Sequence, residues 1–207
     1  MEKETLVLDW LRINTDAPNW IKVAIIKAIG VTPEQLWEVC PEPCWLLQVL
    51  MENSKNSLWP SEKQILSLVC DVVEKYALKP LEGHAEHEIM RLCLETSRSY
   101  LRNQCFKDDV TDAIKSVYDI NPRKFHTDSL LINKMYSAIY SITSTGASVQ
   151  NPSPAHPSTA VGHAVMVSAY QACFMFNTSN SQPTSEQVNR IQQVISDYIR
   201  NRVTVPL

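Results

Sequence analysis

The sequence predicts an all-α protein, a multi-helix bundle of about ten helices arranged around a central apolar helix at residues 159–176. Apolar residues recur at helical spacing in most segments. Several segments open with Thr or Ser followed three residues later by Gln, a pattern that caps helix starts. Strand-like alternation with hairpin turns is not found. We expect a single domain over 1–207, and a Trp-rich N-terminal subdomain at 1–55 packed on a helical bundle at 58–207 is an alternative division.

The composition is that of an ordinary globular protein, with 44% hydrophobic and 20% charged residues. The net charge of −3 gives no electrostatic case for a nucleic-acid partner. Only four Gly are present, which nearly excludes a Gly-rich phosphate loop. The N-terminus does not read as a signal peptide, and no charge-free run reaches the length of a membrane span. With six Cys, this favours a cytoplasmic protein with mostly buried thiols and no membrane partner.

Two helices are expected before Gly30, at residues 4–13 and 18–29. The stretch at 30–50 then organises the chain. Thr32 and Gln35 form a capping box that begins a third helix, and Pro41 and Pro43 end it because proline cannot donate a backbone hydrogen bond. The next helix opens after this break and ends near residue 53. The break is called the elbow below (residues 37–45), and Trp37 and Trp45 at its two ends are expected to lock one helix against the other.

Further helices follow along the chain. Capping boxes at 61–64 and 184–187 open the fifth and the last helix, and helices are expected between them at 84–105, 108–118, 129–142 and 159–176. Residues 143–158 are rich in Ser and Pro, which indicates a long loop, either a solvated connection or a binding loop. The helix at 159–176 should accept close neighbours because small residues recur every fourth position, at Ala160, Ala164, Ser168 and Ala172.

The most chemical-looking group is His84, His87 and Glu88, whose spacing places them within about one helical turn, as metal ligands on a helix require. The alternative is a solvated helix start. Cys40 and Cys44 form a C-x3-C pair that could join the histidines in a zinc site, but their spacing to the histidines matches no standard finger. We expect buried free thiols and no cofactor. His163 is expected to be a core histidine with one hydrogen bond.

All five Trp lie in the first 59 residues, which indicates either an aromatic subcore or an interaction surface. For the second interpretation, the predicted partner-binding residues are Trp37 and Trp45 with the acidic neighbours Glu34, Glu38 and Glu42. These carboxylates would meet a basic partner surface and speed association. An ordinary solvated helix face is the alternative explanation for them.

The residues at 36–41, LWEVCP, and 45–47, WLL, resemble a loose group of all-helical bacterial and phage proteins. Some members of that group are labelled immunity proteins of polymorphic-toxin systems. Their hallmark is a Trp, then a Cys, then a short gap to Trp-Leu-Leu, and Cys44 stands where that group has an acidic residue. The resemblance implies a non-enzymatic helical protein that binds another protein.

We therefore expect a non-enzymatic intracellular protein that binds a protein partner and acts by steric blockade, as an immunity-like or phage-derived inhibitor or scaffold. Two alternatives stay open. One is a helical metal-binding protein or metalloenzyme that uses His84, His87 and Glu88, and the other is a small-molecule sensor with an interhelical pocket. The sequence leaves the partner and the oligomeric state open.

Overall fold

The computed structural model describes residues 30, 32, 35, 37–38, 40–79, 82–83, 86–119, 155–175 and 183–205, with the backbone alone for 118, 155–158 and 170–175. Within these residues every regular element is helical and no strand occurs, which confirms the all-α class. The helices expected at 4–13, 18–29 and 129–142 lie outside the described residues, so the count of about ten stays a prediction.

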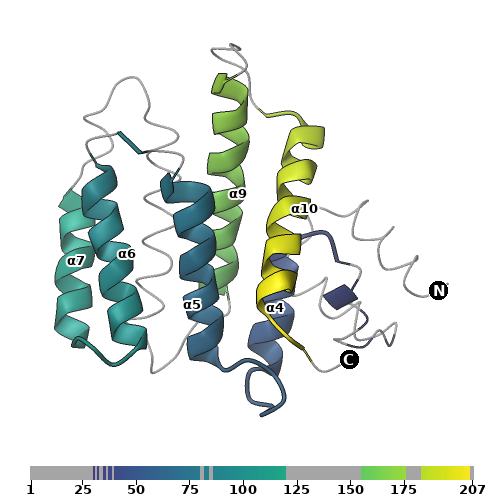
Figure 1. The fold of residues 1–207 in the computed structure, drawn as a ribbon, viewed down its shortest axis with the longest axis horizontal. Helices are drawn as coiled ribbons and strands as arrows, with labels where there is room; N and C mark the ends of the chain where they lie inside the picture. Colours follow the sequence, from purple (N-terminus) through teal and green to yellow (C-terminus); the bar gives the residue numbers. More distant parts are fainter. Residues whose placement is uncertain are drawn as a thin grey trace.

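The described part contains six α-helices and one π-helical segment. Figure 1 shows α6 and α7 paired on one side of α5, with α9 on its other side, between α5 and the pair α10 and α4. None of the described helices is both long enough and apolar enough to cross a lipid bilayer. The elements are, in chain order, α4 (Pro43–Asn53), α5 (Glu62–Val73), η1 (Glu74–Leu78), α6 (His87–Leu101), α7 (Lys107–Asp119), α9 (Ala155–Met175) and α10 (Ser185–Arg202).

Helix α9 is the central helix that the sequence predicts, since it contacts α4, α5, η1 and α10. It begins at Ala155 rather than at 159, so the last four residues of the expected loop at 143–158 are helical. Pro157 fits there because the first turn of a helix has no intrahelical partner for its N–H groups. Ala160 and Ala164 of the small-residue ladder are fully buried, and a Cβ built on Gly162 would lie 3.5 Å from the Cys44 Sγ on α4.

The three capping boxes are confirmed by their hydrogen bonds. The Thr32 amide donates to Gln35 Oε1 at 3.0 Å, and the Gln35 amide donates to Thr32 Oγ1 at 3.2 Å. The Ser61 amide donates to Gln64 Oε1 at 2.8 Å. At α10 the corresponding bonds between Thr184 and Gln187 are 2.8 and 3.2 Å. Each box supplies acceptors for amides that the helix itself leaves without partners.

The apolar stripe of α5 continues to Ala77 as expected, but its last turn widens into the π-helix η1, which the sequence does not predict. The final carbonyls of a helix lack intrahelical donors. One of them, the carbonyl of Tyr76, accepts a hydrogen bond from the Ser168 hydroxyl of α9 at 2.6 Å. The end of this helix is therefore tied to the central helix.

Helix α6 is shorter than the expected 84–105 and runs from His87 to Leu101. Asn103 ends it with a left-handed φ of 57°, which Asn tolerates better than most residues. The Gln104 amide donates to the Ser99 carbonyl at 2.8 Å, and the Asn103 amide donates to the Tyr100 carbonyl at 2.9 Å. This pair of bonds is a Schellman motif, built here on Asn instead of the usual Gly.

Candidate functional site

The two tryptophans of the elbow lie in the hydrophobic core. Trp37 is 3% exposed and Trp45 is 2% exposed. Trp45 sits in the first turn of α4, two residues after Pro43, which occupies the first helical position. This burial agrees with the aromatic-subcore interpretation. A partner-binding role for Trp37 and Trp45 therefore stays a prediction that would act through the shape of the elbow.

Helix α10 holds the backbone of the elbow. Arg200 Nε donates to the Trp37 carbonyl at 2.8 Å, and its Nη2 donates to the Cys40 carbonyl. The buried Ser196 hydroxyl donates to the Pro41 carbonyl at 2.7 Å. These carbonyls need donors from outside because the helix ends here and the prolines following it have no N–H. The sequence alone did not identify Arg200 and Ser196. The two prolines indicate that nearby carbonyls need hydrogen-bond donors, but they do not indicate which residues supply them.

The predicted acidic residues divide between exposed, half-buried and undescribed positions. Glu38 is exposed and Glu42 is half-buried just before α4, where its carbonyl accepts the Trp45 amide at 3.1 Å. Glu34 lies outside the described residues. Glu38 and Glu42 thus lie within the elbow. Their interaction with a basic partner surface stays a prediction.

Cys40 in the elbow and Cys70 in α5 carry thiols of low reactivity. Burial raises the pKa of Cys40 and of Cys70 to about 12, so both thiols are protonated at neutral pH. A protonated thiol is a poor nucleophile and a poor metal ligand. Among the described residues Cys40, Cys70 and Cys93 are buried and form no disulfide, whereas Cys44 is half-buried, so the expectation of buried thiols is met at Cys40 and not fully at Cys44.

The predicted metal ligands are only partly placed. His84 lies outside the described residues, and His87 is half-buried at the start of α6. Glu88 is exposed and holds Arg91 through two bonds, at 2.9 Å from Nε and 2.6 Å from Nη2, and the hydrogen bond from Arg91 lowers the pKa of Glu88. Among the residues that the structure covers, no three His, Cys, Asp or Glu side chains gather as metal ligands would. The metal site at His84, His87 and Glu88 stays a prediction.

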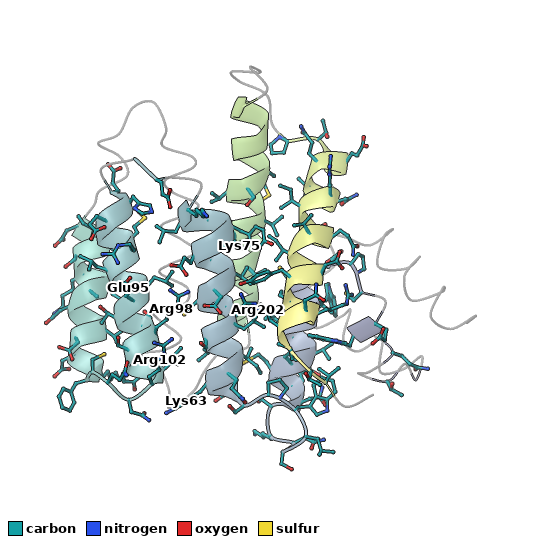
Figure 2. All side chains as sticks on the ribbon, in the orientation of Figure 1. Lys63, Lys75, Glu95, Arg98, Arg102 and Arg202 are labelled. Atoms are coloured by element: carbon teal, nitrogen blue, oxygen red, sulfur yellow. The ribbon has the colours of Figure 1, made fainter. Side chains whose placement is uncertain are left out.

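A group of basic side chains that the sequence does not single out lies between α6, α5 and α10 (Figure 2). We call it the basic face. Lys63 Nζ of α5 donates to Asn103 Oδ1, beside Arg102, at 2.9 Å. It consists of Lys63, Lys75, Arg98, Arg102 and Arg202.

Arg98 is the member of the basic face that has carboxylate partners. Its Nη2 lies 2.8 Å from Asp71 Oδ1 and 2.6 Å from Glu74 Oε2, and its side chain is 14% exposed. The three groups bind α6 to the end of α5. No described carboxylate forms an ion pair with any of the other four, which we call the unpaired cations: Lys63, Lys75, Arg102 and Arg202.

Two tyrosines hold two of these cations in place. The rings of Tyr76 and Tyr198 meet edge to face, with centroids 5.6 Å apart and an angle of 81°. Lys75 Nζ lies 4.2 Å from the Tyr198 centroid and 5.1 Å from that of Tyr76. The Arg202 guanidinium carbon lies 5.1 Å from the Tyr198 centroid. Cation–π attraction therefore orders both charges without neutralising them.

A groove of about 550 Å³ opens beside Arg202. Its walls are the turn before α5, one side of α5 and the extended backbone that follows α10. Leu58 in the turn is 70% exposed, whereas its neighbour Trp59 is 6% exposed and anchors the turn. The residues that define its character are Leu58, Trp59, Pro60, Leu68, Asp71 and Arg202. The groove therefore has a mixed lining that is more polar than apolar, with Leu58 as its exposed apolar side chain and Arg202 as its cation.

Comparison of the chain with protein-family models, with curated proteins and with solved structures gives no match. The resemblance of the elbow residues to helical immunity proteins therefore stays an expectation. What the site does has to be argued from its own geometry and charge.

Proposed function

We propose that this chain is a non-enzymatic protein-binding protein that blocks its partner sterically, with the groove beside Leu58 as the docking site. The observation that carries the proposal is an exposed leucine fixed at the edge of a groove. A single exposed leucine is common on protein surfaces. Here it lines a groove of about 550 Å³ together with Trp59, Leu68 and several polar residues, an arrangement that supports the docking of a side chain of another protein.

The turn that presents Leu58 is ordered by its own hydrogen bonds. The Leu58 amide donates to Asn56 Oδ1 at 3.0 Å, and the Trp59 amide donates to the Asn56 carbonyl at 2.9 Å. The buried Trp59 then fastens the turn to the core. A side chain held in its binding position loses little conformational entropy when a partner covers it. The turn therefore supports a preformed contact surface.

The resemblance of residues 36–47 to helical immunity proteins supports the same class of function. In its fuller form, the proposal is an immunity-like inhibitor or scaffold of bacterial or phage origin that acts in the cytoplasm. Helices at 4–13, 18–29 and 129–142 would complete a bundle of about ten. A stiff bundle suits steric blockade, because it covers a partner's site without rearranging itself.

The test is partner capture by the whole chain from its native host, compared between the wild type and Leu58→Ser. Leu92→Ser is the matched control, since Leu92 on α6 is also exposed, at 49%, but does not line the groove. We expect a complex of fixed stoichiometry with the wild type and Leu92→Ser, and at least a tenfold weaker one with Leu58→Ser, about the loss of ~1.4 kcal/mol or more that a contact residue carries.

Titration of the captured partner then tests the blockade. The partner's own activity should fall to a plateau at one equivalent of the wild-type chain. Capture that is equal for Leu58→Ser and Leu92→Ser would reject the groove as the docking site. A complex that leaves the partner fully active would reject steric blockade.

A further inference from the structure

We infer that the groove receives an acidic segment of the partner protein, whose carboxylates lie on the unpaired cations while an apolar side chain packs against Leu58. This inference rests on the proposed function and names the chemistry of the partner. The first step is the distribution of charge. The chain is acidic overall, with 22 Asp and Glu against 19 Lys and Arg, yet Lys63, Lys75, Arg102 and Arg202 gather on one face with no ion pair among the described residues.

Two carboxylates of α5 and η1 that lie at this face are paired with Arg98 and not with these four cations. Asp71 and Glu74 are both bound by Arg98, at 2.8 and 2.6 Å. Asp71 is also the acidic residue among the groove's lining residues, and Arg202 lies at the same groove. Because its acidic groups are already engaged, the face is left with a surplus of positive charge. That surplus is complementary to a segment rich in Asp and Glu.

The positions of the cations favour binding because they are set before the partner arrives. Lys75 and Arg202 lie against the ring of Tyr198, and Lys63 donates to Asn103. Held in this way, a long basic side chain gives up less rotamer freedom on binding than a free one. Lys63, Lys75 and Arg202 therefore act as fixed charges on the basic face, and Arg202 also lines the groove.

The surroundings point to a protein segment rather than to nucleic acid. In the groove that Arg202 lines, the exposed Leu58 offers apolar contact that a sugar–phosphate backbone does not use. The engaged carboxylates of Asp71 and Glu74 lie within the face and would repel a continuous line of phosphates. An acidic peptide with one apolar side chain fits both features.

The test uses a labelled peptide of Glu and Asp with one central Leu, its counterpart with Gln and Asn, and a single-stranded oligothymidine. Binding to the full chain is measured by fluorescence anisotropy at low and at physiological salt. The variant is Lys75→Gln, Arg102→Gln and Arg202→Gln combined. The matched control is Lys107→Gln, Lys115→Gln and Arg190→Gln, which removes the same charge from exposed positions of α7 and of the far end of α10.

We expect the acidic peptide to bind, its neutral counterpart to bind at least tenfold more weakly, and higher salt to weaken the complex. Each lost cation should weaken binding about 2- to 5-fold, so the site variant should lose roughly 10- to 100-fold and the control variant less than about 2-fold. Equal binding of the acidic and neutral peptides, tighter binding of the oligothymidine, or equal losses in both variants would overturn the inference.

Two variants, Leu58→Ser and the three-charge site variant, separate this inference from the proposed function when their capture of the partner is compared. If Leu58→Ser abolishes capture but the three-charge site variant does not change it, the groove is the docking site and the acidic chemistry is wrong. If Leu58→Ser has no effect while the acidic peptide still binds, the basic face binds acidic segments and the proposed docking site is wrong.

Discussion

Two arginines of α10, two positions apart, show how differently the elbow and the basic face use positive charge. Arg200 donates to the carbonyls of Trp37 and Cys40, and its side chain is 20% exposed. Arg202 lies over Tyr198 at the rim of the groove and pairs with no described carboxylate. Residues two apart on a helix point to different sides. The guanidinium of Arg200 is thus used in holding the elbow, whereas the cations of the basic face remain available to a partner.

Truncation of a core indole should have the largest effect. Trp45→Ala should lower the free energy of unfolding by about 3–5 kcal/mol, because it leaves a cavity where a ring that is 2% exposed now packs. Urea denaturation measures the change, and Trp45→Phe should lose less. A loss below about 1 kcal/mol, typical of an exposed position, would place Trp45 outside the core and dissolve the contrast between the two regions.

Arg200→Ala should cost about 2–3 kcal/mol, because it removes the donors for two main-chain carbonyls of the elbow. Ser196→Ala should cost about 1–2 kcal/mol through the carbonyl of Pro41. Hydrogen exchange of the amides at residues 44–47 should also speed up in both variants. Arg200→Ala with unchanged stability would mean that water replaces the guanidinium, and the hydrogen bonds from Arg200 to the elbow would then contribute nothing to stability.

Raising the pH above 9 should lower the free energy of unfolding, because the elbow and α5 each bury a thiol. Cys40 in the elbow and Cys70 in α5 keep their protons up to a pKa of about 12 in the fold, whereas the ordinary thiol value is 9.0. Ionisation of the unfolded chain therefore lowers stability between pH 9 and 12 by about 1.4 kcal/mol per pH unit for each thiol, and not below pH 9. Denaturation midpoints across this range should fall less steeply in Cys40→Ala and Cys70→Ala combined.

Gly162→Ala should stabilise the protein by about 0.5–1 kcal/mol, since glycine within a helix is entropically costly. The added Cβ would meet Cys44 Sγ at 3.5 Å, an ordinary contact. Thermal unfolding with Cys44→Ala as the background tests whether that contact matters. Destabilisation by Gly162→Ala would show that α4 and α9 are packed too closely to accept one carbon.

Arg102→Ala should have the smallest effect, within about 0.5 kcal/mol of the wild type, because this exposed residue has no ion pair in the described chain. Set beside Arg200→Ala, it asks whether an arginine of the basic face carries stability at all. A loss comparable to that of Arg200→Ala would show that the basic face is part of the structural framework.

Local signals in the sequence predicted helix starts well where a capping box marks them, whereas the start of α9, which has no such box, was placed four residues too late. The boxes at Thr32, Ser61 and Thr184 need only residues within one turn, and all three are present. The end of α6 was placed four residues too late, because Asn103 does what Gly usually does.

The candidate site was largely invisible to the same reasoning. The cations of the basic face lie on four elements, and the donors of the elbow lie far along the chain from it, so no local pattern joins them. Only the folded chain shows that Arg98 has carboxylate partners and that Lys75 rests on Tyr198.

The hydrogen bonds that Ser196 and Arg200 donate to the elbow also affect how the protein folds during its synthesis. Its three bonds join residues that are 155, 160 and 163 positions apart. Contacts so distant in sequence form late and slow the search for the native state. During synthesis the elbow emerges long before Ser196 and Arg200, so its carbonyls wait for the last helix. The elbow should therefore stay accessible to proteases on the ribosome until α10 has left the exit tunnel and supplies these donors.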